Sequence, residues 1–181
     1  MRLLTDTCAA IKLLTFGSKL FTPGILRQGD LVLHPRVFRE TRKWPPYKKE
    51  KYKAELAQLN KIKATAGLML PLDKKETLGR LIFATMDEIG SPIGAADRDQ
   101  LAAAIYHQME IITNDSPFSQ VAEALEVFVH TAESIVIEAY RQSVLTKEEV
   151  KAARELWIKN EEKLPSQEDQ KELRKICKKN L

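Results

Sequence analysis

Cysteine is scarce in this chain of 181 residues, which contains only two. Cys8 and Cys177 lie near opposite ends of the chain, with no C-x-x-C motif and no Cys/His ligand spacing around either of them. This usage excludes a small disulfide-stabilised scaffold and a zinc-ribbon type of site, and it favours a reducing compartment.

Long apolar runs are also absent. No segment reaches the roughly 18 uncharged apolar residues that a membrane span needs. The first apolar run is interrupted by Asp6 and Lys12, and Arg2 is the single base ahead of it, a pattern unlike that of a secretory signal. We therefore expect a cytoplasmic protein without a membrane segment.

The few glycines are not arranged in the common nucleotide-binding or nucleophile motifs. The sequence has no G-x-G-x-x-G after a strand, no complete P-loop and no G-x-S-x-G. The three histidines, His34, His107 and His130, have no ligand spacing, so we expect surface or capping histidines rather than catalytic ones. With 7 Gly and 8 Pro, a collagen-like or low-complexity chain is excluded as well.

Positive charge is concentrated in one part of the chain. Residues 36–63 carry ten Lys and Arg against three Glu, a local net charge of +7 in a chain whose total is +4. Interleaved aromatic residues make this stretch suitable for a nucleic-acid backbone, and a solvated helix face is the alternative interpretation. The side chains expected to bind nucleic acid are Arg36, Arg39, Arg42, Lys43, Lys48 and Lys49.

Short apolar runs alternate with longer amphipathic segments, which predicts an α/β fold with crossover helices. We expect a three-layer sandwich with a central, mostly parallel twisted sheet of four to five strands in residues 1–130. A C-terminal helical extension, residues 131–181, is expected to pack on this domain or project from it. The predicted strands cover residues 1–5, 30–33, 68–72, 109–113 and 126–129, the last of which is favoured over the alternative that it ends the preceding helix. The main predicted helices cover residues 7–20, 47–65, 73–90, 95–108 and 132–142, with others starting near 35, 116, 146 and 166.

Acidic residues follow two of the predicted strands. Asp6 comes after the first strand and Asp115 after the strand over 109–113, and ligands of such sheets bind beyond the carboxyl ends of the strands. Neighbouring strands lie about 4.8 Å apart, so these side chains converge if their strands pair. Asp97 lies in the first turn of a helix, where the macrodipole favours a carboxylate. Asp99 is about 200° away around the same helix, so only one of the two can face the site.

Clustered carboxylates repel each other unless one is protonated or a cation lies between them. Mg²⁺ or Mn²⁺ is the natural cation for oxygen ligands, and its bound water can attack a phosphodiester. An acidic centre within a basic rim is typical of a nuclease. The interpretation that Asp6 and Asp115 only cap the helices that follow them stays open at this point.

Two segments resemble the PIN-domain nucleases, which include ribonucleases of the VapC type. Residues 3–10, L-L-T-D-T-C-A-A, resemble the opening strand and helix, in which an Asp-Thr or Asp-Ser pair ends the strand. Residues 93–115 resemble the second half of that family, in which an Asp opens an Ala-rich helix and Thr-x-Asp ends the next strand. The spacing of this motif selects Asp97 over Asp99.

A third segment, residues 31–40, resembles the second strand and short helix of the family, including its Glu. The resemblance covers about residues 1–130 and implies a metal-dependent endoribonuclease that uses Mg²⁺ or Mn²⁺. It implies the catalytic residues Asp6, Glu40, Asp97 and Asp115, of which Asp6, Asp97 and Asp115 are the metal ligands. The supporting residues that it implies are Thr7, Thr113 and Asp99.

The same resemblance implies partners. RNA is the expected substrate, and such domains often act as toxins that a small antitoxin protein restrains. Two alternatives stay open: a nuclease that acts on DNA, and a catalytically weak module that binds nucleic acid or a protein. The C-terminal helices are candidates for docking a partner or a second copy of the chain in a homodimer.

Overall fold

The computed structural model describes residues 1–65, 93–160 and 167–178. Within this part of the chain, four strands form one all-parallel sheet in the order β2-β1-β3-β4. The strands are β1 (Arg2–Thr5), β2 (Asp30–Leu33), β3 (Glu110–Ile112) and β4 (Val129–His130). The predicted α/β fold with a parallel central sheet is therefore confirmed.

Helices follow each strand. The helices are α1 (Thr7–Leu14), η1 (Lys19–Phe21), α2 (Pro35–Lys43), α3 (Pro46–Lys51), α4 (Lys53–Thr65), α6 (Ala95–Tyr106), α7 (Ser116–Ala124), α8 (Ala132–Arg141), α9 (Lys147–Lys159) and α10 (Gln167–Lys178). None of the helices in the described ranges has the length and apolar character of a membrane span.

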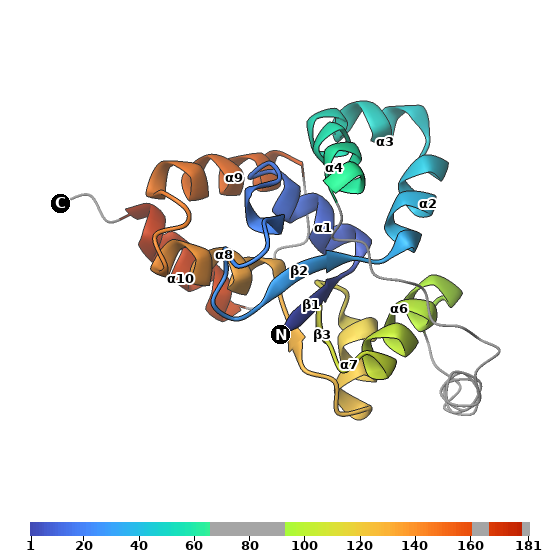
Figure 1. Ribbon diagram of the computed structural model, residues 1–181. Coiled ribbons are helices and arrows are strands. Elements are labelled where there is room, and N and C mark those ends of the chain that lie inside the picture. The colour runs from blue at the N-terminus through green and yellow to red at the C-terminus, as the bar shows by residue number, and fades with distance from the viewer. Residues whose placement is uncertain (66–92, 161–166, 179–181) are drawn as a thin grey trace.

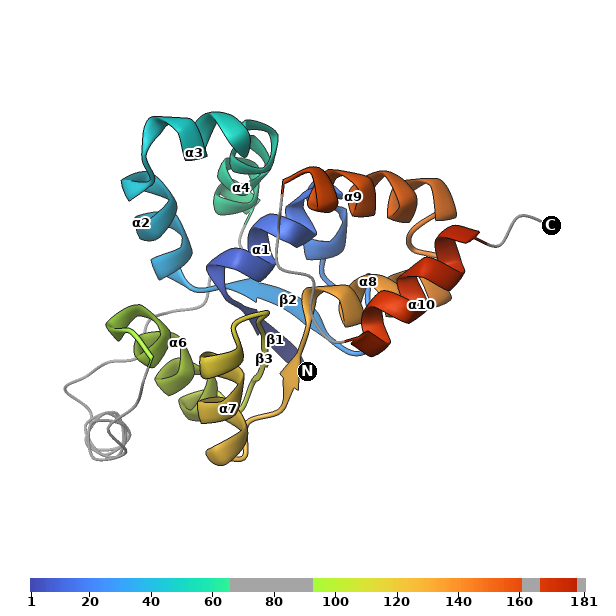
Figure 2. The same ribbon diagram turned by 180° about the vertical axis from the view of Figure 1, so that it is seen from behind.

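Helices cover both faces of the sheet, as the three-layer prediction requires. Successive strand residues point to opposite faces, so Leu3 and Leu4 belong to different apolar clusters. The cluster around Leu4 and Ile111 includes side chains of α6 and α7, whereas the cluster around Leu3 and Ile112 includes α1 and α8. Figures 1 and 2 show these two helical layers with the sheet between them. Both faces are buried, which a parallel sheet needs.

The helices of the C-terminal third contribute large side chains to the core. Trp157 of α9 is 1% exposed, its Nε1 donates to Thr15 Oγ1 at 3.2 Å, and Phe16 packs edge-on against its ring. Leu173 and Ile176 of α10 are buried in the same cluster. These helices therefore share one apolar core with α1 and the sheet.

The helix predicted over 47–65 is interrupted. Helix α3 ends at Lys51 and α4 begins at Lys53, because Tyr52 leaves the helical conformation with φ −111° and ψ 29°. The Tyr52 ring is buried beside Trp44, with the ring centroids 5.7 Å apart. The break thus directs an aromatic side chain into the core, which the amphipathic pattern alone did not indicate.

Two other predicted boundaries were wrong, and a residue with positive φ lies at or near each of them. Helix α1 ends at Leu14 rather than near residue 20, and Gly17 follows with φ +70°. The strand predicted over 126–129 lies at Val129–His130, because Glu126 has φ +58° and cannot belong to a strand. The strand predicted over 68–72 and the helix predicted over 73–90 lie outside the described residues.

Candidate functional site

Asp6 lies directly after β1 and forms the N-cap of α1. Its Oδ1 accepts a hydrogen bond from Ala9 N at 2.6 Å, and the Thr113 hydroxyl donates to Oδ2. Burial raises the pKa of Asp6 from 3.8 to about 6; these two hydrogen bonds oppose the rise, and the negative charges of Asp97 and Asp115 add to it. Asp6 is therefore a rigidly held carboxyl group that ionises less readily than an exposed aspartate does.

Asp115 follows β3 and forms the N-cap of α7. Its Oδ1 accepts from Phe118 N at 2.9 Å, and its own backbone N–H donates to Thr113 Oγ1 at 3.0 Å. Buried Thr113 thus contacts both Asp6 and Asp115. Because β1 and β3 are neighbours in the sheet, the loops that follow them lie close together. The sequence predicted this proximity on the condition that the two strands pair.

The two capping interactions agree with the simpler interpretation of Asp6 and Asp115 as capping residues. They do not exclude ligand binding, because a carboxylate has two oxygens with about four acceptor positions. Asp115 is exposed to solvent, and its Oδ1 makes the cap. The same side chain can therefore cap a helix and contribute to a site.

Asp97 and Asp99 have different surroundings. Asp97 lies half-buried in the first turn of α6, where burial, the charge of Asp115 and the charge of Glu40 raise its pKa against a backbone hydrogen bond from Gly94. Asp99 instead forms an ion pair with Arg36 of α2. Asp97 therefore belongs to the electrostatic cluster of acids, and the charge of Asp99 is balanced by a guanidinium.

Glu40 reaches the same edge of the sheet from α2. Its Oε2 accepts a hydrogen bond from Thr7 Oγ1 at 2.6 Å, and Thr7 directly follows Asp6 in the chain. The expected supporting residue Thr7 thus orients Glu40, whereas Thr113 orients Asp6. Each of these hydroxyls donates to a carboxylate, which is a comparatively strong kind of hydrogen bond.

The four acids come from four elements and form a donor set of oxygen atoms alone, which suits Mg²⁺ or Mn²⁺. Burial is the largest cause that raises the pKa values of Asp6 and Asp97; the negative charges of neighbouring acids add to the rise, and a bound cation would offset this repulsion. Within the described residues, no three His, Cys, Asp or Glu side chains are arranged as a ready metal site. Mg²⁺ keeps several waters and needs only one or two carboxylates, so the donor chemistry fits such an ion.

His34 and His107 have capping positions, as the sequence predicted, whereas His130 is a half-buried residue of β4. The Nδ1 of His34 accepts from Arg36 N at 3.1 Å at the start of α2, and burial lowers the pKa of His34 from 6.5 to about 4. His107 ends α6 and packs edge-on against Tyr106, while His130 Nε2 lies 2.6 Å from Glu110 Oε2.

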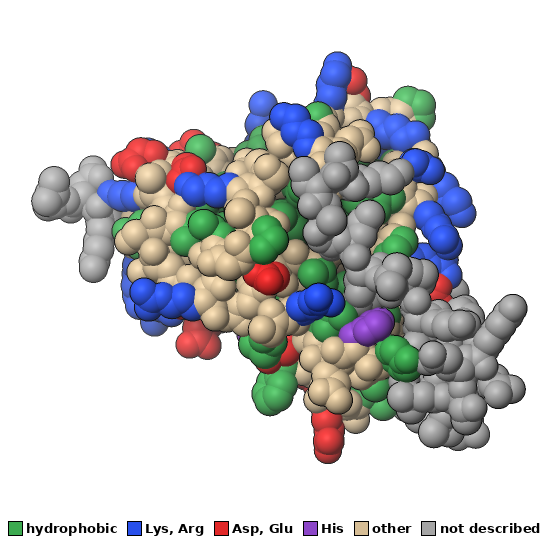
Figure 3. Space-filling model, in the orientation of Figure 1, with side chains coloured by type: hydrophobic (Ala, Val, Ile, Leu, Met, Phe, Trp, Pro, Cys, Tyr) green, Lys and Arg blue, Asp and Glu red, His purple; other side chains and the backbone are tan. Residues whose placement is uncertain are grey.

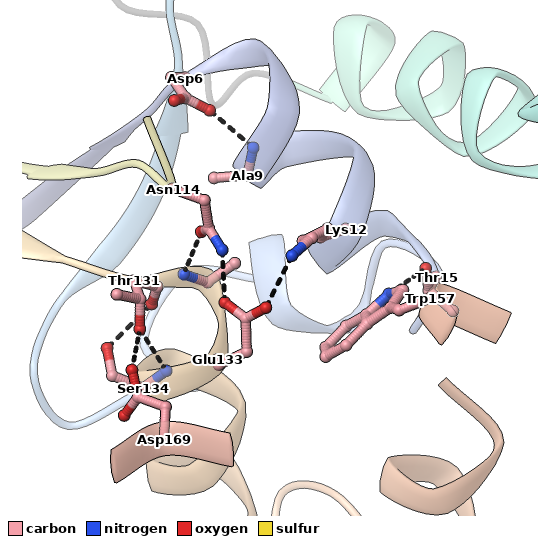
Figure 4. A network of polar contacts seen from close by, with 11 residues as sticks. Asp6, Ala9, Lys12, Thr15, Asn114, Thr131, Glu133, Ser134, Trp157 and Asp169 are labelled. Atoms are coloured by element: carbon pink, nitrogen blue, oxygen red, sulfur yellow. Dashed lines mark hydrogen bonds and ion pairs between the residues drawn. The ribbon is translucent and has the colours of Figure 1, made fainter. Parts of the chain in front are cut away.

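A buried ion pair beside the site was missed at the sequence level. Lys12 Nζ of α1 lies 2.7 Å from Glu133 Oε1 of α8, and both side chains are buried. Asn114 Nδ2 donates to the other oxygen of Glu133 at 2.6 Å, so Glu133 lies between Lys12 and Asn114 (Figure 4). The available signal was Lys12 itself, a single base among the apolar residues of α1. This network fixes the residue directly before Asp115.

The predicted basic surface lies mainly on α2 and α3. Arg39, Arg42, Lys43 and Lys49 are exposed, and blue side chains follow the outer edge over these helices in Figure 3. Lys48 has its Nζ 3.9 Å from the centroid of the Trp44 ring. Among the six predicted residues, Arg36 differs because it is half-buried in its ion pair with Asp99.

Comparison with known proteins gives little beyond this geometry. No protein-family profile and no curated protein sequence matches the chain. One solved structure that it matches is VapBC2 from Rickettsia felis bound to a DNA fragment from their promoter, at 15% sequence identity and a TM-score of 0.44. That match covers 72% of this chain and 98% of the other chain. The resemblance to PIN-domain nucleases therefore depends on the sequence motifs alone.

Proposed function

We propose that this protein is a metal-dependent endoribonuclease that hydrolyses RNA phosphodiester bonds, as the PIN-domain resemblance implies. The observation that carries the proposal is that Thr113 contacts both Asp6 and Asp115, which come from distant parts of the chain, with Asp97 near enough for its charge to act on Asp6. Such a concentration of negative charge at the carboxyl edge of a parallel sheet suits a site for a divalent cation.

Each acid has a role that follows from its contacts. Asp6, Asp97 and Asp115 would hold the ion, and Glu40 would act beside them. A bound Mg²⁺ or Mn²⁺ supplies Lewis-acid polarisation of the phosphodiester and lowers the pKa of bound water. The chain orients Asp6 through Thr113 and Ala9 N, and it orients Glu40 through Thr7. In the hydrolysis, a water oxygen would form a bond to phosphorus and lose a proton, while the P–O bond to the leaving ribose oxygen breaks and that oxygen takes up a proton.

The exposed bases on α2 and α3 supply the substrate-binding surface in this proposal, since they attract phosphates of any sequence. RNA is the proposed polymer, and cleavage of DNA is the alternative. A small antitoxin-like protein is the proposed inhibitor. It would block substrate access by covering this same surface.

A second candidate is a module that binds nucleic acid or a protein without catalysis. The observation that favours it is that Asp6 and Asp115 already cap helices. Salt-sensitive RNA binding without cleavage and without Mn²⁺ binding at millimolar concentration would support this second function.

The test is cleavage of an end-labelled single-stranded RNA in Mn²⁺, with the matching DNA beside it. We expect cleavage that EDTA stops and that Asp97→Asn lowers by about 10²-fold or more. The matched control is Glu123→Gln, which removes an exposed carboxylate from α7, the helix that Asp115 caps. Intact RNA, or activity that survives both Asp6→Asn and Asp97→Asn, would overturn the proposal.

A further inference from the structure

A pocket of about 260 Å³ opens directly beside the acidic cluster. Helix α1 contributes Ile11 to its wall, and the segment around α3 contributes Trp44 and Tyr52. The loop after β3 contributes Asn114 and Asp115. Because Asp115 belongs both to this pocket and to the cluster of carboxylates, a ligand in the pocket lies next to the proposed reaction site.

The walls of the pocket are aromatic and held in place. Trp44 and Tyr52 are 8% and 9% exposed, their ring centroids are 5.7 Å apart, and their planes are inclined by 54°. The exposed lining is mostly apolar. Rigid aromatic walls suit a planar ring system, which gains contact area there at low conformational cost.

The polar groups of the pocket suit an aromatic ring that carries hydrogen-bonding atoms and lies next to a negative charge. The lining has one carboxylate, that of Asp115, and two lysines, Lys48 and Lys12, of which Lys12 is paired with Glu133. Lys48 Nζ, 3.9 Å from the Trp44 centroid, places a cation at the pocket. The Asn114 side chain cannot turn freely, because its Nδ2 donates to Glu133 and its Oδ1 accepts from Ala132 N. A fixed amide beside an apolar wall is typical of a site that recognises the edge of a ring.

We propose that this pocket, the base pocket, binds one unpaired nucleobase of a nucleic acid strand, with Lys48 contacting an adjoining phosphate. The base must be unpaired, because only a base that has left the stack can enter a pocket between side chains. This inference rests on the proposed nuclease function, for which it names the substrate class: a single-stranded segment with one base seated beside Asp115.

The first test uses the exposed thiol of Cys8, which lines the base pocket. Alkylation by a maleimide is followed by mass spectrometry in EDTA with each of the four ribonucleoside 5′-monophosphates at millimolar concentration. We expect at least one nucleotide to slow alkylation of Cys8 about tenfold or more, while the reaction of Cys177 is unchanged. Ribose 5-phosphate and inorganic phosphate, which lack a base, are expected to give no protection.

The second test measures binding of a labelled single-stranded RNA by anisotropy in EDTA. Trp44→Ala and Lys48→Gln are each expected to weaken binding about fivefold or more. Trp44→Phe keeps an aromatic ring in the core and should retain most of the affinity if Trp44→Ala fails to fold. The controls are Phe128→Ala and Lys171→Gln, which remove an exposed ring and an exposed charge of α10; neither residue lines the base pocket.

Both tests are done without metal, so their outcome is separate from that of cleavage. RNA cleavage without nucleotide protection of Cys8 would overturn the base pocket and leave the nuclease intact. Protection without cleavage would support the base pocket and contradict the nuclease. Protection by phosphate alone, or by a protein partner and by no nucleotide, would also overturn the base pocket.

Discussion

The candidate site needs Asp6 as a carboxylate, but this ionised form makes the folded protein less stable because the side chain is buried. Its pKa of about 6 in the folded protein lies above the ordinary value of 3.8, mainly because the side chain is buried. The folded state therefore binds the proton more tightly than the unfolded state does. The stability from this proton is complete below pH 3.8 and is lost as the pH rises through 6.

We predict that Asp6→Asn raises the free energy of unfolding at pH 7 in EDTA by about 1–3 kcal/mol. The Asn Oδ1 can still accept from Ala9 N, so the cap of α1 is kept. Urea unfolding of both proteins between pH 4 and 8 is the measurement. The difference should shrink as the pH falls towards 4, and a difference that is independent of pH would contradict the assigned cause.

The Lys12–Glu133 pair gives a second prediction for single side chains. Glu133→Gln leaves a buried ammonium group without its counter-charge, so it should lower the free energy of unfolding by about 3–5 kcal/mol. Lys12→Met in the Glu133→Gln background should restore much of this loss, because it removes the uncompensated charge. Urea unfolding of the four proteins of this double-mutant cycle gives the coupling energy.

The exposed pair Lys19–Glu149 is the matched control for this cycle, since both of its side chains are about 40% exposed. Its coupling energy should stay within about 1 kcal/mol. Equal coupling in the buried and the exposed pair would show that burial does not determine the strength of the Lys12–Glu133 interaction.

Among the elements, α9 shows that the C-terminal helices stabilise the α/β core. Trp157→Ala should lower the free energy of unfolding by about 3–5 kcal/mol, because it removes a side chain that is 1% exposed. The neighbouring Ile158 is 47% exposed, so Ile158→Ala should change the free energy of unfolding by less than about 1 kcal/mol. Urea unfolding checks both variants, and similar effects would contradict the packing of α9.

The sequence predicted where elements begin better than where they end. The starts of α7 and α9 carry local signals, namely Ser116-Pro117 and the capping box at Thr146. Both helices start there, although the N-cap of α7 is Asp115 rather than Ser116. The break at Tyr52 depends instead on tertiary burial against Trp44, and α1 ends at Leu14, three residues before Gly17 with its positive φ. The hydrophobic periodicity of a segment carries no information about either feature.

For the molecule as a whole, strand order explains how much of the candidate site could be predicted. Asp6 and Asp115 were expected to converge because charged residues at the carboxyl ends of paired strands share one edge of the sheet. The partners of Arg36, Thr7 and Lys12 could not be predicted, because these contacts join residues 63, 33 and 121 positions apart. Such contacts are fixed only when whole layers pack.

The distribution of charge over the molecule predicts the salt dependence of RNA binding. Changing the four exposed bases on α2 and α3 to Gln should weaken binding and reduce the slope of log K against log salt by about 2–3. The positions are Arg39, Arg42, Lys43 and Lys49. Binding in EDTA at several salt concentrations is the measurement, and an unchanged slope would place the phosphate contacts elsewhere.

The most direct test of the central claim is anomalous diffraction from a crystal soaked in millimolar Mn²⁺. We predict a manganese peak among the carboxylate oxygens of Asp6, Asp97 and Asp115, the three residues proposed to hold the ion. Density without manganese at these carboxylates, or manganese bound only elsewhere on the surface, would contradict the account.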